Sequence, residues 1–194
     1  DAKGHRRDPW QVCANGGAAA LGALLARYAG GRLVGGELAL WIVTGSLAAA
    51  AADTWASSIG PLARRAPRLI FTGRAVSAGT SGAVSWAGTA GATAGALLVT
   101  LPGWLTGHNA MAGAGAIIGL AGMLADSMLG ATVQGRFRCP ACGVPSEWRR
   151  HKCGTSTIRE GGWRWLSNDG VNAVATTAAA VAAWAAWCWL SPSP

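Results

Sequence analysis

Three apolar segments of the sequence each carry a carboxylate near one end. Asp53 follows a run of five alanines, Asp126 lies within GLAGMLADSMLG, and Asp169 stands where the last apolar segment begins. Carboxylate oxygens are hard ligands of the kind that Mg²⁺ prefers in sites that also hold nucleotide phosphates. The pattern predicts that Asp53 and Asp126 share a magnesium ion in a phosphoryl-transfer site.

Each carboxylate also has a simpler explanation, as a helix cap or an interfacial charge. Asp169 fits a cap, because it lies at the start of its segment. Asp53 and Asp126 fit less well, because each lies toward the C-terminal end of its segment, where a negative charge opposes the helix dipole. The sequence therefore favours a functional role for this pair.

Further polar residues fall beside the same segment ends. The stretch GTSGAVS favours a nest of backbone N–H groups at a helix N-terminus, which suits phosphate, although GTSG is also a common turn sequence. Arg74, just before it, would offset phosphate charge. The candidate catalytic residues are Asp53, Asp126 and Arg74. The candidate phosphate-binding residues are Asn15, Ser57, Ser58, Gly79, Thr80, Ser81, Gly82, Ser85, Ser127, Gln134, Asn168, Asp169 and Asn172.

Familiar soluble kinases are excluded by the motifs that the sequence lacks. It contains no GxxxxGK[ST] P-loop and neither the HRD nor the DFG motif of protein kinases. Phosphoryl transfer would therefore depend on a differently built site, in which positioning and electrostatics do most of the catalysis.

Four soft ligands lie close together in one basic segment, at Cys139, Cys142, His151 and Cys153. The CPAC pair resembles one half of a zinc-ribbon site, whereas the HxC half is not a standard spacing. Free reduced thiols are the alternative, since a disulfide is disfavoured in a reducing cytoplasm. The cluster is a candidate structural zinc site.

Long uncharged segments make up much of the chain. Only 12% of the residues are charged and 51% are hydrophobic, whereas soluble domains carry about 25% charged residues. Uncharged apolar runs of about 18 residues or more are typical of membrane-spanning helices. We expect an all-α, polytopic membrane bundle, a single domain over residues 1–194 with five spans. The expected spans are 12–29, 36–54, 83–105, 110–132 and 170–190. Because the sequence begins with Asp1 rather than Met, we also expect an N-terminal truncation.

Small residues recur within the expected spans. Gly91 and Gly95 are spaced four apart, as are Gly115 and Gly119. This spacing lets helix backbones approach closely in lipid, although a bias toward small residues in the composition would also produce it. In either case the composition predicts a tightly packed bundle.

Basic residues indicate the orientation of the bundle. Of the 16 Lys and Arg residues, all but Arg27 and Arg32 fall in the N-terminal segment, in the loop 56–82 or in the loop 134–168. The positive-inside rule places these three regions on the cytoplasmic side of the cytoplasmic membrane. The candidate site and the Cys/His loop at about 134–168 would then both face the cytoplasm. Because membrane topology accounts for the basic residues, the high isoelectric point does not indicate binding to nucleic acid, and we expect no nucleic-acid partner.

Six ordered motifs resemble those of the integral membrane family of transmembrane protein 19, to which plant phytyl-phosphate kinase belongs. They are QVCANGGAAAL, AAADTWASSIG, GTSGAVSWAGTAG, DSMLGATVQ, the CPAC…HKCG cluster and NDGVN. The resemblance covers essentially the whole chain. It implies a membrane enzyme that phosphorylates a prenyl monophosphate to the diphosphate, using CTP or another nucleoside triphosphate. Family members usually have additional hydrophobic segments before QVCANGG, which agrees with the expected truncation.

Two other classes of membrane protein remain open at this stage. A transporter would also place Asp residues between tightly packed helices, although usually nearer the bilayer midplane. A lipid-binding protein would need the basic face to hold anionic lipid, but not the carboxylates. For the kinase, the expected partners are membrane lipid, an isoprenoid phosphate and a nucleotide.

Overall fold

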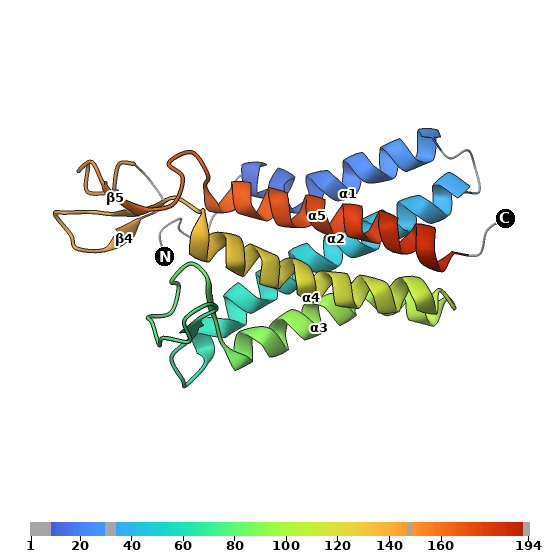
Figure 1. The fold of residues 1–194 in the computed structure, drawn as a ribbon, viewed down its shortest axis with the longest axis horizontal. Helices are drawn as coiled ribbons and strands as arrows, with labels where there is room; N and C mark the ends of the chain where they lie inside the picture. The colour runs from blue at the N-terminus through green and yellow to red at the C-terminus, as the bar shows by residue number, and fades with distance from the viewer. Residues whose placement is uncertain (1–8, 30–33, 147–148, 192–194) are drawn as a thin grey trace.

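The computed structural model describes residues 9–29, 34–146 and 149–191. Within these ranges the chain forms the five expected long helices (Figure 1). They are α1 (Pro9–Ala29), α2 (Val34–Ile59), α3 (Trp86–Leu105), α4 (Asn109–Thr132) and α5 (Asn168–Leu190). The all-α prediction is confirmed. The largest correction concerns α2, which continues past residue 54 until Gly60 and Pro61 end it, because proline disfavours the helical conformation of the residue before it.

Helix α2 is the centre of the bundle and packs against each of the other four long helices. Glycines make the closest approaches, as their spacing predicted. A Cβ atom added at Gly95 of α3 would lie 2.8 Å from the carbonyl oxygen of Ala51, and one added at Gly91 would lie 3.0 Å from that of Trp55. Side chains at these positions would force α3 away from α2.

The bundle carries small residues inside and large apolar residues outside. Its buried cluster consists of Ala48, Ala52, Ala92, Ala96 and Met123. Large side chains such as Leu98, Ile117 and Val181 are exposed. Lipid tails are as apolar as leucine, so a membrane bundle gains from close packing of small residues rather than from hiding large ones.

Within the residues that the structure describes, three segments are long and apolar enough to cross a membrane: Gly36–Leu62, Asn109–Thr132 and Asn168–Leu190. They comprise α2 together with the short 3₁₀ helix η1 (Gly60–Leu62), α4, and α5. For α1 and α3, a membrane-spanning role stays a prediction.

In the described part of the chain, two small antiparallel sheets, which the sequence did not predict, lie in the loops at one end of the bundle (Figure 1). Between α2 and α3, β1 (Arg68–Leu69) pairs with β2 (Ala83–Val84). Between α4 and α5, β3 (Arg136–Arg138) lies between β4 (Pro145–Ser146) and β5 (Ile158–Gly161). Helices α1, α3 and α5 begin at this end and α2 and α4 finish here, so both basic loops share it.

Candidate functional site

A polar cavity of about 350 Å³ lies at the loop-bearing end of the bundle. All five long helices contribute to its wall, together with the loop that precedes α3. Fourteen of the predicted site residues line it: Asn15, Asp53, Ser57, Ser58, Gly79, Thr80, Ser81, Gly82, Ser85, Asp126, Ser127, Gln134, Asn168 and Asn172. The structure thus brings most of the predicted site together.

Asp53 of α2 and Asp126 of α4 both line this wall, with their carboxyl groups close enough to interact. Small residues nearby allow the two helices to lie this close, since a Cβ atom added at Gly119 would lie only 2.9 Å from the Cβ of Ala48. Two ionised carboxylates in contact repel each other. The pair therefore needs either a shared proton or a cation between the two groups.

Two buried oxygens of the cavity residues have no hydrogen-bond partner within the described ranges. They are Oδ1 of Asp126 and Oδ1 of Asn172. A buried, unsatisfied polar atom costs about 1–3 kcal/mol, so its presence calls for an explanation. Carboxylate and amide oxygens are ligands that Mg²⁺ and Ca²⁺ accept. The residues present therefore fit a hard divalent cation.

The N-termini of α3 and α5 both face the cavity. Ser85 caps α3, where its hydroxyl accepts a hydrogen bond of 3.1 Å from the backbone N–H of Gly88. Ser167 caps α5 by accepting one of 3.3 Å from Gly170. Free N–H groups and the helix dipole make such ends favourable positions for phosphate.

We expected Asp169 to cap α5, but the cap is Ser167, and Asp169 lies in the first helical turn. A carboxylate there still interacts favourably with the dipole. Asp169 is also absent from the cavity wall, although its neighbour Asn168 lines it.

The GTSG stretch is a turn rather than the start of a helix. The N–H of Thr80 donates to the carbonyl of Ser77, so the predicted nest of free amides is incomplete. The hydroxyl of Ser81 donates to Oε1 of Gln134 at 2.9 Å and ties this loop to the end of α4. Gly82 has a φ of +76° and packs against Ala131, which leaves no room for a side chain.

Arg74 lies outside the cavity wall, with an exposed side chain. Its backbone belongs to the turn after β1, where its carbonyl accepts from the N–H of Leu69 at 3.0 Å. Among the described residues, no Lys or Arg lines the cavity. Sequence reasoning also missed three polar residues of the wall: Gln11, Thr54 and Thr89. The one feature of the sequence that could have indicated these residues is that they lie close to predicted site residues.

A second cleft, of about 440 Å³, is lined by arginines, which the cavity wall lacks. It is lined by Gly135, Phe137, Arg149, Arg150, Arg164, Trp165, Leu166 and Ser167. Two of these directly adjoin cavity residues in the chain, since Gly135 follows Gln134 and Ser167 precedes Asn168. The arginines of this cleft were predicted only as topogenic charges.

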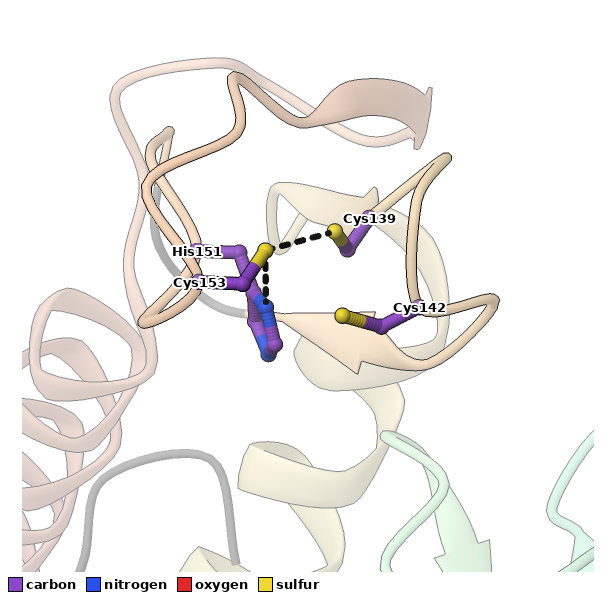
Figure 2. Close-up of side chains that lie close together, drawn as sticks. All are labelled: Cys139, Cys142, His151 and Cys153. Atoms are coloured by element: carbon purple, nitrogen blue, oxygen red, sulfur yellow. Dashed lines mark hydrogen bonds between the residues drawn. The ribbon is translucent and has the colours of Figure 1, made fainter.

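The four predicted soft ligands converge, and Figure 2 shows their side chains directed toward one another. Their ligand atoms all lie within 4.8 Å of one another. The sulfur of Cys153 is 3.6 Å from that of Cys139 and 3.1 Å from Nδ1 of His151. Hydrogen bonds from the side chain of Thr155 and from His151 lower the pKa of the Cys153 thiol to about 5, whereas hydrogen bonds with Cys153 and Cys139 raise the pKa of Cys142 to about 11.

Comparisons with known proteins identify the family. The family model described as integral membrane protein DUF92 matches residues 1–180. An uncharacterized membrane protein of Methanocaldococcus jannaschii is 42% identical over 95 residues, which cover 47% of this chain and 40% of that protein. Protein PGR of Arabidopsis thaliana is 33% identical over 149 residues, covering 68% of this chain and 49% of that protein.

The chain spans about half or less of the length of these curated relatives. No solved structure matches it. Because the family model extends over nearly all of the sequence, the protein belongs to the integral membrane protein family DUF92.

Proposed function

We propose that this protein is a membrane phosphotransferase that converts a polyprenyl or phytyl monophosphate to the diphosphate with a nucleoside triphosphate such as CTP. One observation carries the proposal: the contact between Asp53 and Asp126, beside the unpartnered oxygens of Asp126 and Asn172, in a cavity at the end of the bundle. The resemblance of the six motifs to the transmembrane protein 19 family supplies the substrate class.

Asp53 and Asp126 would hold Mg²⁺, with Asn172 as a third oxygen ligand. When bound, the ion offsets the negative charge of nucleotide phosphates and stabilises the charge that develops during phosphoryl transfer. This role explains why two carboxylates are held in contact without a basic side chain between them.

The reaction requires little covalent chemistry from the protein's own side chains. A terminal oxygen of the prenyl phosphate forms a bond to the γ-phosphorus, while the bond from that phosphorus to the β–γ bridging oxygen breaks and the nucleoside diphosphate leaves. The attacking oxygen is already anionic, so no general base is required. The N-termini of α3 and α5 would orient and stabilise the phosphates.

The surroundings of the cavity suit a substrate with a polar head and an apolar tail. Trp55 and Trp86 are exposed, and each directly follows a cavity residue in the sequence, Thr54 or Ser85. Tryptophans are enriched where membrane meets water. The phosphate would therefore enter the cavity at the depth of the lipid headgroups, while the isoprenoid tail stays among the lipid-exposed side chains of the bundle.

The basic loops support a cytoplasmic position for this end of the bundle. The cavity lies at the same end as the loops that carry Arg64, Arg149 and Arg164. By the positive-inside rule this end faces the cytoplasm, where nucleoside triphosphates are available.

The proposal is tested with the purified protein in lipid nanodiscs. Prenyl phosphates of several chain lengths are incubated with each γ-labelled nucleoside triphosphate and Mg²⁺. We expect label in the prenyl diphosphate, lost with EDTA and in the Asp53→Asn variant. If no phosphate acceptor gains label, and Mg²⁺ with CTP leaves the accessibility of a Ser58→Cys variant unchanged, the kinase proposal is wrong. A lipid-binding protein or a transporter then becomes the better hypothesis.

A further inference from the structure

We propose that Cys139, Cys142, His151 and Cys153 bind one structural zinc ion, and that this ion organises the loop between α4 and α5. The inference is independent of the proposed reaction, because the four ligands lie outside the polar cavity. It depends on the geometry of the ligands, on the two turns that carry them and on the lack of an apolar core around them.

The ligand distances match a single tetrahedral ion. Zinc binds thiolates at about 2.3 Å, which places two sulfurs of one tetrahedron about 3.8 Å apart. The sulfurs of Cys139 and Cys153 are 3.6 Å apart, and all four ligand atoms lie within 4.8 Å of one another. All three thiols are free rather than paired in a disulfide. Three thiolates and an imidazole form the closed ligand set of a structural site.

Two similar turns present these ligands. The first joins Cys139 to Cys142 and closes with Gly143 at a φ of +70°, whose N–H donates to the carbonyl of Cys139 at 2.8 Å. The second joins His151 to Cys153 and closes with Gly154 at a φ of +85°. Its N–H donates to the carbonyl of His151, also at 2.8 Å. Glycine suits both closing positions because positive φ strains other residues. The HxC spacing thus forms a second, shorter turn of the same kind.

The loop needs such a cross-link because it has almost no core of its own. In the described part of the loop between α4 and α5, the buried apolar side chains are Phe137, Cys139 and Leu166, and Phe137 and Leu166 lie near its two ends. The strands β4 and β5 are short and pair only with β3. Small folded segments such as this loop are usually stabilised by disulfides or metals, because they cannot bury enough apolar surface. Zinc binding would supply that stabilisation.

The ion would also fix two arginines of the second cleft, a consequence that rests on the proposed function. Arg149 and Arg150 directly precede the ligand His151 and line that cleft. The Nε of Arg150 donates to the carbonyl of Gly154 at 2.9 Å, which ties it to the second turn. Losing zinc would therefore free two arginines that, if the second cleft takes part in the proposed reaction, would contact phosphate there.

Metal analysis of the purified full chain tests the site. We expect about one zinc per chain, and substitution by Co²⁺ should give the intense visible bands of a tetrahedral thiolate site. The variant Cys142→Ser should lose most of the zinc. Matched controls are Cys13→Ser in α1 and Cys188→Ser in α5, which should keep it. A parent protein without zinc, or without cobalt–thiolate bands after Co²⁺ loading, would overturn the proposal.

Limited proteolysis in nanodiscs tests the organising role, and it does not depend on catalysis. Trypsin should cleave the loop 134–168 slowly in the zinc-bound protein and at least about tenfold faster after chelation or in Cys142→Ser, because ordered segments resist cleavage. The loop 56–82 is the internal control, and its cleavage should not change. Equal cleavage of the Cys/His loop with and without zinc would overturn the organising role.

Discussion

The carboxyl groups of Asp53 and Asp126 lie close enough to interact although they belong to different helices. Each lies one to two turns before the end of its helix, α2 or α4. Both helices run toward the same end of the bundle (Figure 1), so the carboxylates meet at one depth. The bundle thus brings the carboxylates of α2 and α4 together in the same cavity wall as the unpartnered oxygen of Asn172.

The first prediction concerns this pair. Replacing either residue with Asn keeps its size but removes the charge that a hard divalent cation requires. We expect Asp53→Asn and Asp126→Asn each to lower Mg²⁺-dependent turnover by about a hundredfold or more. Membrane insertion should not change, since Asn is no more costly than Asp at that depth. Steady-state kinetics in nanodiscs, with the amount of inserted protein quantified, measures both.

Asp169→Asn is the matched control for these variants. Asp169 lies outside the cavity wall and in the first turn of α5, where a carboxylate interacts favourably with the helix dipole. Its substitution should leave turnover within about twofold of the parent. Parental turnover in both cavity variants would show that the catalytic site lies elsewhere.

The second prediction concerns the packing of α3 on α2. In Gly95→Ala the new methyl group would lie 2.8 Å from the carbonyl oxygen of Ala51, so the helices must separate. We expect a loss of about 1–3 kcal/mol in the free energy of unfolding, measured by denaturation in mild detergent. In Gly113→Ala of α4 the methyl group meets nothing within 4 Å. That variant should be neutral or slightly more stable, and a comparable loss there would contradict the packing argument.

The helices and most of the site could be predicted from the sequence, because membrane spans are encoded in length and charge alone. The polar residues could be assigned to one end because consecutive spans alternate in direction, which places Asp53, Asp126 and Asn168 together. The end of α2 could not be placed, since Ala56 favours a helix and Ser57 and Ser58 do not stop one strongly. Only the Gly60 and Pro61 pair marks where it stops.

The loops could not be predicted, because their geometry depends on contacts distant in the sequence. Arg74 is held in an exposed turn by the bond between its carbonyl and Leu69, and its proximity to GTSG gave no sign of this. The second cleft forms because the N–H of Gly135 bonds to Leu166 and that of Trp163 bonds to Val133. No periodic pattern encodes strands as short as β3 and β4.

The third prediction concerns topology. Ser77 lies in the loop before α3, and Asn109 lies at the opposite end of the bundle, where α4 begins. A membrane-impermeant maleimide applied to intact cells should modify Asn109→Cys but not Ser77→Cys, which should react only after permeabilisation. Mass spectrometry of the peptide carrying the new cysteine distinguishes it from the native thiols. The reverse pattern would place the cavity on the outer face and remove its access to cytoplasmic nucleotide.

The last prediction separates two sources of positive charge for the nucleotide. Arg164 lines the cleft that adjoins the cavity, whereas Arg74 is exposed outside the cavity wall. A charge-assisted hydrogen bond to phosphate contributes about 1.5 kcal/mol or more, which corresponds to roughly a tenfold change in an equilibrium constant. We expect Arg164→Gln to raise KM for the nucleoside triphosphate about tenfold, with little change in KM for the prenyl phosphate.

Arg74→Gln is the comparison, and its KM for the nucleotide should stay near that of the parent. Both substitutions remove one charge from a basic loop, so a general electrostatic effect would raise KM equally in both and would weaken with added salt. A rise confined to Arg164→Gln would instead locate nucleotide binding in the second cleft. A rise confined to Arg74→Gln would mean that the loop 56–82 moves over the cavity when nucleotide binds, and that the second cleft has no part in the reaction.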